Sequence, residues 1–176
     1  MRKSLTVLYF YMLSLNCVLC NDTQFILHDK CINVLYRPAT VYFNDSAISV
    51  HRDSRGIILR FELKNAETEY YKLTDDTLNK LIKIQDFLAK NKNPAIIEVH
   101  VSDVSSEDLK KLKKWEISAV IAGNIGSVFN ANGNWNDRQV SAIGYGEFLP
   151  SNNTSNNGGK ISNRVDIIIL CNINGE

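Results

Sequence analysis

The sequence lacks a strong charge of either sign. Its 20 lysine and arginine residues nearly balance its 19 aspartate and glutamate residues, which gives a formal net charge of +1. No global basic field is therefore present to attract nucleic acid or anionic lipid. Aromatic residues make up only 9% of the chain and are not interleaved with a basic patch. Nucleic acid is therefore not an expected partner.

The motifs of common catalytic and metal sites are also missing. The chain contains no glycine-rich phosphate loop, no His-Glu-x-x-His pair and no Gly-x-Ser-x-Gly elbow. His100 and Asp103 lie too close along one expected strand, on opposite faces, to form a catalytic pair. Neither Cys31 nor Cys171 pairs with histidines at the spacing of a metal site. The sequence therefore predicts no enzyme, no cofactor and no metal.

The N-terminus carries an apolar run that is too short to span a bilayer. Residues 5–19 follow Arg2 and Lys3 and fall short of the roughly 20 residues that a spanning helix needs. This pattern is typical of a secretory signal peptide, assigned to residues 1–20, with an uncleaved anchor as the alternative. Cys20 is the candidate lipidation site, although ordinary cleavage after Cys20 also fits the small residues that such cleavage prefers. Export to the periplasm, with outer-membrane association, is the expected localisation.

Cysteine is scarce in the rest of the chain. Of the four cysteines, Cys17 and Cys20 fall in the signal region, which leaves Cys31 and Cys171. In an oxidising periplasm two cysteines that flank one domain can form a disulfide. Two separate free thiols are the equal alternative.

The pattern of apolar residues predicts an α+β fold in the order β-α-β-α-β-β. Residues 21–45 show no clear period, with a short strand expected at residues 41–43. Thr74 is a good helix N-cap and is followed by Asp75 and Asp76 in the first turn. The expected elements are a strand-turn-strand over 50–63, a helix from 74, a strand at 95–101, a helix at 115–129, and strands at 139–146 and 164–170.

Four stretches, taken in order, carry a family resemblance. They are residues 49–59, Val101-Ser-Asp103, Lys114-Trp-Glu-Ile-Ser-Ala-Val-Ile-Ala122, and Ser141-Ala-Ile-Gly-Tyr-Gly-Glu-Phe-Leu-Pro150 followed by Asn163-Arg-Val-Asp-Ile. Together they resemble the C-terminal domain of the OmpA/MotB family, whose members associate with peptidoglycan. The resemblance assigns residues 46–172 to the domain, 21–45 to an N-terminal flank and 173–176 to a tail.

The resemblance implies a two-layer OmpA-like fold with a mixed four-stranded sheet in the order 1-4-2-3. The last strand would run antiparallel to the others. The end of this strand would then lie near the start of the first, which makes a Cys31–Cys171 bridge geometrically credible.

The resemblance also implies a site for the diaminopimelate residue of the peptidoglycan stem peptide. Asp103 matches the acidic residue that binds the ammonium group. The arginine that binds the carboxylate is replaced by Ile121, and the family asparagine is replaced by Lys114. Ser118 belongs to the same motif, and Arg164 matches one of the paired arginines of the closing motif. Lys114 and Arg164 are the candidates for a compensating positive charge.

Two functions follow from this comparison of motifs. The first is a non-enzymatic envelope anchor that associates with peptidoglycan, with weakened binding because the bidentate guanidinium–carboxylate pair is lost. The second is a scaffold subunit of an envelope-spanning machine that has lost peptidoglycan binding. Small OmpA-domain lipoproteins of the Dot/Icm type IV secretion system provide a looser resemblance in size and layout. The expected partners are peptidoglycan, other envelope or secretion-system proteins, and the outer membrane through a lipid anchor.

Overall fold

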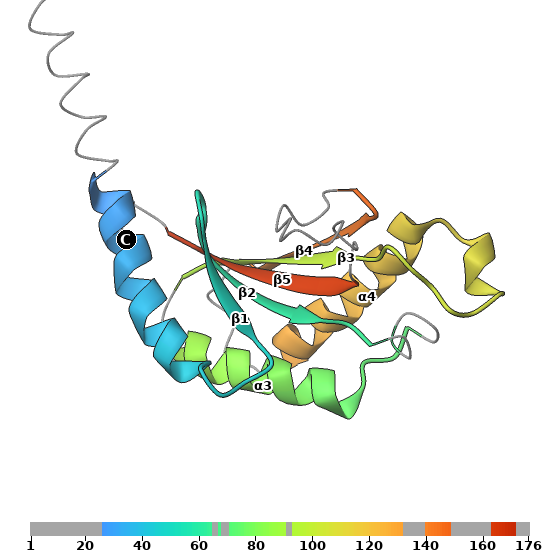
Figure 1. Ribbon diagram of the computed structural model, residues 1–176, viewed down its shortest axis with the longest axis horizontal. Coiled ribbons are helices and arrows are strands. Elements are labelled where there is room, and N and C mark those ends of the chain that lie inside the picture. Colours follow the sequence, from blue (N-terminus) through green and yellow to red (C-terminus); the bar gives the residue numbers. More distant parts are fainter. Residues whose placement is uncertain are drawn as a thin grey trace, which may run out of the picture.

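The computed structural model describes residues 26–64, 67, 71–90, 93–131, 140–148 and 163–171. Two helices cover one face of a single sheet, and a third helix crosses one end of it (Figure 1). The labelled elements are β1 (Ser49–Asp53), β2 (Gly56–Glu62), α3 (Asp75–Ala89), β3 (Ala95–His100), the 3-10 turn η1 (Leu109–Lys111), α4 (Lys114–Ala131), β4 (Val140–Gly146) and β5 (Arg164–Leu170). The expected signal peptide with Cys20 and the tail lie outside the described residues.

The α+β class is confirmed, but the expected count of four strands is wrong. Within the ranges given above, the sheet has five strands in the order β1-β2-β5-β3-β4. Its last four follow the predicted order 1-4-2-3, with β5 antiparallel to both β2 and β3. The additional strand is β1, which pairs with β2 across a tight turn. Asp53 fixes this turn because its carboxylate accepts hydrogen bonds from the backbone N–H and the Nε of Arg55.

The core lies between the sheet and the two covering helices. Alternate residues of β2 and β5 point toward the helices, and the residues between them point to the opposite face. Ile57, Leu59 and Phe61 of β2 are buried on the helical side, as are Ile167 and Ile169 of β5. This alternation places Arg60 and Asp166 on the face that the helices leave uncovered.

The helix α3 begins where the sequence predicts. The Thr74 side chain accepts a hydrogen bond from the Thr77 N–H, as an N-cap does. The buried carboxylate of Glu67 in turn accepts hydrogen bonds from the Thr74 hydroxyl and the Lys64 N–H. These contacts fix the position at which the chain enters α3.

The prediction for the N-terminal part of the chain is wrong in one respect. Residues 26–42 are helical, so residues 41–43 do not form a strand. Ile32, Leu35, Ala39 and Phe43 recur every three or four residues and all lie in the core. The helical period was present in the sequence, but the polar residues between these positions and Pro38 obscured it. This N-terminal helix packs on α3 through Phe43 and Phe87, whose ring centroids are 5.3 Å apart.

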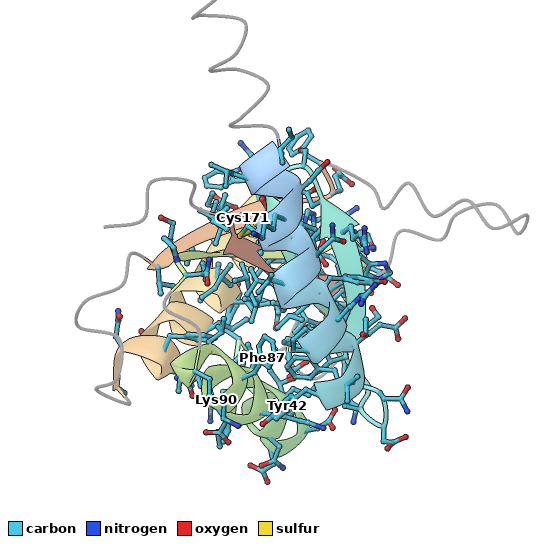
Figure 2. All side chains as sticks on the ribbon, turned by 90° about the vertical axis from the view of Figure 1, so that its left-hand side faces the viewer. Tyr42, Phe87, Lys90 and Cys171 are labelled. Atoms are coloured by element: carbon cyan, nitrogen blue, oxygen red, sulfur yellow. A yellow bond between two sulfur atoms is a disulfide. The ribbon has the colours of Figure 1, made fainter. Side chains whose placement is uncertain are left out.

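A disulfide joins the N-terminal helix to the end of β5. Cys31 and Cys171 are bonded, with their Cα atoms 5.8 Å apart and 140 positions apart in sequence. Cys171 is labelled beside the N-terminal helix in Figure 2. Every residue of the described core falls between Ile32 and Cys171. The chain from residue 21 onward therefore contains the whole described core.

None of the helices in the described ranges has the length and apolar composition required to cross a membrane.

Candidate functional site

Asp103 lies in an exposed loop just after β3, and this loop is held by one buried side chain. The Asn163 Oδ1 accepts hydrogen bonds from the backbone N–H groups of Ser102 and Asp103, at 2.8 and 3.0 Å. The Asn163 amide also donates to the Asp103 carbonyl at 2.7 Å. Because Asn163 is only 8% exposed, the start of β5 fixes the backbone that carries the candidate acid.

The Asp103 side chain is exposed and has both a backbone and a charged neighbour. Its Oδ1 accepts a hydrogen bond from the Val104 N–H at 2.9 Å, so one oxygen caps the backbone of the loop. Lys110 lies nearby, and its pKa is raised by its hydrogen bond to Glu107, by the charge of Glu107 and also by the charge of Asp103. Both partners of the Lys110–Glu107 ion pair are exposed. An exposed pair contributes little stability, so a ligand can exchange with it at small cost.

Lys114 is held by a different acidic residue. Its Nζ lies 2.6 Å from the Glu147 carboxylate, in the turn that follows β4. The two residues border a surface cavity of about 400 Å³, together with Trp115 and Phe148. The positive charge of Lys114 is therefore already partnered.

Ser118 has a structural position between α4 and β4. It is fully buried, donates to the Trp115 carbonyl at 2.9 Å and accepts a hydrogen bond from the Gly146 N–H at 2.8 Å. Gly146 has a φ of +56°, and a Cβ on it would lie 2.6 Å from the Trp115 nitrogen. A Cβ on Gly144 would lie 2.2 Å from the nitrogen of Ala119. Both glycines allow β4 to approach α4 closely, and Ser118 locks that contact.

Ile121, at the position of the family arginine, lies in the core. Its side chain is 0% exposed, like those of Ile117 and Ile125 one turn away on each side. An arginine at this position would bury a guanidinium among apolar side chains, which is strongly unfavourable without a carboxylate partner. In this chain the position therefore completes the apolar face of α4.

Arg164 is part of a buried network on the uncovered face of the sheet. The Asp166 carboxylate accepts hydrogen bonds from the Nε and Nη2 of Arg60, at 2.6 and 2.8 Å, and from the Nε of Arg164 at 3.1 Å. Arg164 and Asp166 are each only 3% exposed. Burial alone would raise the pKa of Asp166, but the hydrogen bonds and charges of the two arginines lower it. Arg164 thus binds Asp166 in the interior and is not an exposed cation beside Asp103.

His100 and Glu98 lie next to this network on β3. The His100 Nε2 is 3.7 Å from Asp166, and Glu98 forms an ion pair with Arg55 at 2.7 Å. Ligand atoms of Glu98, His100 and Asp166 lie within 4.8 Å of one another, close enough to hold a metal ion. A metal ion is nevertheless disfavoured there, because the guanidinium groups of Arg60 and Arg164 already lie against Asp166. Burial and the charge of Arg164 lower the pKa of His100 to about 4, so its imidazole is neutral. The arginines already balance the carboxylates.

Three residues that organise the site were not among the sequence-based candidates. Asn163 holds the Asp103 loop, Lys110 lies beside Asp103, and Arg60 neutralises Asp166. Asn163 stands first in the closing motif, so its position was a usable signal. Lys110 belongs to a run of lysines that the sequence does not distinguish from an ordinary solvated surface. Only the structure shows which member of the run lies near the acid.

Sequence comparisons give no match, whereas solved structures match the fold. No protein-family model and no curated protein matches the chain. A MotB-like protein from Desulfovibrio vulgaris is 23% identical, with a TM-score of 0.68 over 88% of this chain and 98% of the other. The cell wall anchor of the T6SS from Pseudomonas aeruginosa is 18% identical, with a TM-score of 0.59 over 76% of this chain and 96% of the other.

A third similar structure is the periplasmic domain of Helicobacter pylori MotB. It is 18% identical, with a TM-score of 0.55 over 72% of this chain and 83% of the other. At these identities the likeness concerns the fold. The chain therefore has the α+β fold of MotB-like, OmpA-like domains, as the motifs predicted.

Proposed function

We propose that this protein is a non-enzymatic component of the bacterial envelope that associates with peptidoglycan through Asp103. The observation that carries the proposal is the exposed Asp103 carboxylate on a loop that Asn163 holds in place. A fixed carboxylate of this kind can accept hydrogen bonds from the ammonium group of a diaminopimelate residue without first ordering its backbone. The fold shared with a cell wall anchor and with MotB supports the same conclusion.

Lys110 is the best available partner for the ligand carboxylate. Lys110 and Lys114 each form an exposed ion pair, with Glu107 and Glu147, so pairing alone does not separate them. The charge of Asp103 acts on Lys110. Arg164 is buried against Asp166, and Ile121 is apolar. Lys110 is exposed and lies near enough to Asp103 for the two charges to interact. An ammonium offers a point charge where an arginine offers a bidentate fork. A loss of one charged hydrogen bond, about 1.5–3 kcal/mol, corresponds to binding weaker by roughly tenfold to a hundredfold.

The proposed location is the periplasm, with attachment to the outer membrane through lipid on Cys20. The basic and apolar N-terminus supports export. The proposal thus joins two contacts in one chain, a lipid attachment at the N-terminus and a wall-binding loop in the domain.

Co-sedimentation of residues 21–176 with insoluble peptidoglycan sacculi tests the wall contact. Asp103→Asn keeps a side-chain oxygen that can cap Val104 but removes the charge, and it should reduce the bound fraction at least about tenfold, because a charged hydrogen bond is lost. Asp108→Asn is the matched control, because the Asp108 side chain is 90% exposed in the same segment, and it should bind as wild type does. Lys110→Gln should weaken binding less than Asp103→Asn. Equal binding by all four proteins would refute a role for Asp103.

The second candidate is a scaffold subunit of an envelope-spanning machine, such as a Dot/Icm type IV secretion system. The observation that favours it is the buried Ile121. An apolar core residue stands here where the resemblance implies the ligand-binding arginine. If wild-type protein remains in solution beside sacculi, this scaffold function replaces the anchor. Restoring the family residue with Ile121→Arg is a poor test of either function, since the variant buries an unpaired charge.

A further inference from the structure

The N-terminal helix has an apolar outer face. Its inner side packs into the core, but Ile26, Leu27, Val34 and Val41 are 65%, 46%, 63% and 80% exposed. Leu27, Val34 and Val41 are spaced seven residues apart, so they lie along one side of the helix. Figure 2 looks onto this helix from outside the molecule. A stripe of exposed apolar side chains on one element is a feature of interaction surfaces.

Basic side chains surround this stripe. Lys30 and Arg37 lie exposed on the helix itself. The guanidinium of Arg52 on β1 lies 4.5 Å from the centroid of the Tyr36 ring. Lys83 on α3 and Lys90 at its C-cap lie 5.6 and 5.8 Å from the centroid of the Tyr42 ring. Asp29 on the helix, and Asp86 on α3 one turn from both Lys83 and Lys90, are also exposed and offset two of these charges. The five basic groups outnumber these two acidic groups, so the side chains named around this helix are basic on balance, although the net charge of the whole chain is close to zero.

We propose that the outer face of the N-terminal helix docks on an anionic phospholipid surface. Apolar side chains that insert below the headgroups, with lysines and arginines beside them, are the features of a helix that lies in a membrane interface. Each basic side chain close to an anionic surface strengthens partitioning roughly fivefold. A second copy of the chain fits less well, because pairing two such helices would bring Lys30 and Arg37 against like charges.

The position of the helix in the chain also supports docking on a phospholipid surface. This step rests on the lipid attachment in the proposed function. Ile26 lies only six positions after Cys20 in the sequence. A chain of six residues reaches at most about 20 Å. A lipid at Cys20 would therefore keep the helix next to the bilayer, where a weak surface affinity suffices because the effective concentration is high.

Docking through this helix would orient the wall-binding loop. The Cys31–Cys171 bond ties the helix to the end of β5, whereas Asn163 at the start of β5 holds the Asp103 loop. The seven residues of β5 span roughly 20 Å. The helix and the η1 segment lie at opposite ends of the sheet (Figure 1). A membrane contact at the helix would therefore leave Asp103 at the far end of the domain, facing away from the bilayer.

An environment-sensitive fluorophore at position 34 tests the proposal. Residues 21–176 carrying Val34→Cys would be labelled and tethered by an N-terminal hexahistidine to vesicles that contain a nickel-chelating lipid, which replaces the lipid at Cys20. On vesicles of phosphatidylglycerol and phosphatidylethanolamine, the label should shift to the blue and be quenched by spin-labelled lipids. A label at Val120→Cys is the matched control, because Val120 is 46% exposed on α4 and should report water.

Substitutions without the tether measure the contributions of charge and apolar contact. Lys30→Glu combined with Arg37→Glu should lower partitioning to anionic vesicles by more than tenfold, and so should Val41→Asp. Val120→Asp should leave it unchanged. The proposal would be overturned if the fluorescence of the label at position 34 did not shift on tethered anionic vesicles, or if it shifted equally on neutral vesicles. A shift that appears without vesicles and grows with protein concentration would also overturn it, because it would assign this face to contact with a second copy. None of these results involves sacculi, so failure here is separate from failure of the wall-binding function.

Discussion

Asp103 and Asp166 are both carboxylates near the same end of the sheet, but their surroundings differ. Asp103 is exposed beside Lys110, whereas Asp166 is 3% exposed and lies between Arg60 and Arg164. Exposed ion pairs contribute about 0–1 kcal/mol to stability, while removal of one partner from a buried pair costs about 3–5 kcal/mol. The comparison indicates that the charges of the closing motif hold the fold, and that the charges of the loop remain available to a ligand.

The largest expected effect comes from removing the buried carboxylate. Asp166→Ala leaves the guanidinium groups of Arg60 and Arg164 without the acid that they share, and should lower the free energy of unfolding by about 3–5 kcal/mol. Urea denaturation followed by circular dichroism measures the change. Asp108→Ala, which removes an exposed acid, should change stability by less than about 0.5 kcal/mol. If the two substitutions changed stability by similar amounts, the buried carboxylate would not stabilise the fold more than an exposed one does.

Removing the disulfide should lower the stability of the fold without removing binding to peptidoglycan. A Cys31→Ser/Cys171→Ser variant should lose about 2–5 kcal/mol, because the bond closes a long loop in the unfolded chain. Binding to sacculi should persist wherever the variant remains folded, since Asn163 holds the Asp103 loop at the other end of β5. Thiol counting on denatured, unreduced residues 21–176 should find no free thiol. Two titratable thiols would show that Cys31 and Cys171 are not bonded.

The pH dependence of stability reports on His100. Its pKa is about 4 in the folded protein, against 6.5 when exposed, so the unfolded chain binds more protons between these values. The free energy of unfolding should therefore fall by up to about 3 kcal/mol as the pH drops from roughly 6.5 to 4. His100→Gln should remove this part of the pH dependence. A wild type and a variant with parallel pH profiles would show that His100 is not buried in its neutral form.

The smallest effect on stability is expected at the candidate acid itself. Asp103→Asn retains an oxygen for the Val104 N–H and should change the free energy of unfolding by less than about 0.5 kcal/mol. Thermal denaturation of the variant beside wild type gives this value. A loss above about 2 kcal/mol would show that Asp103 serves the fold, and would undermine its assignment as a ligand-binding residue.

The sequence predicted the arrangement of strands better than it predicted the site. The apolar pattern of β2, the apolar run of β5 and the cap at Thr74 are local signals, and each corresponds to an observed element. Two elements, the N-terminal helix and β1, were not predicted correctly, because their assignment depends on which parts of the chain pack against them. The N-terminal helix is recognisable only once Ile32 and Leu35 are seen to face the core. β1 was visible as half of a hairpin, but the family pattern did not count it as a separate strand.

Site residues were harder to predict for the same physical reason. Residue type alone does not reveal that Arg164 is buried against Asp166, or that Lys114 is engaged by Glu147. Which lysine of residues 110–114 lies near Asp103 depends on how η1 and its flanks pack, and no sequence period encodes that. Motifs identify residues that can carry a charge; burial determines which of them can meet a ligand.

The most direct test of the account is an NMR titration of residues 21–176 with free meso-diaminopimelate, following backbone amide shifts. The largest shifts should fall in the exposed loop, at Asp103, Val104 and Lys110, and they should disappear in Asp103→Asn. The amides of Arg60 and Asp166 in the buried network should remain unchanged. Shifts that gather on the network, or a loop that does not respond while sacculi still bind, would contradict the assignment of wall binding to Asp103.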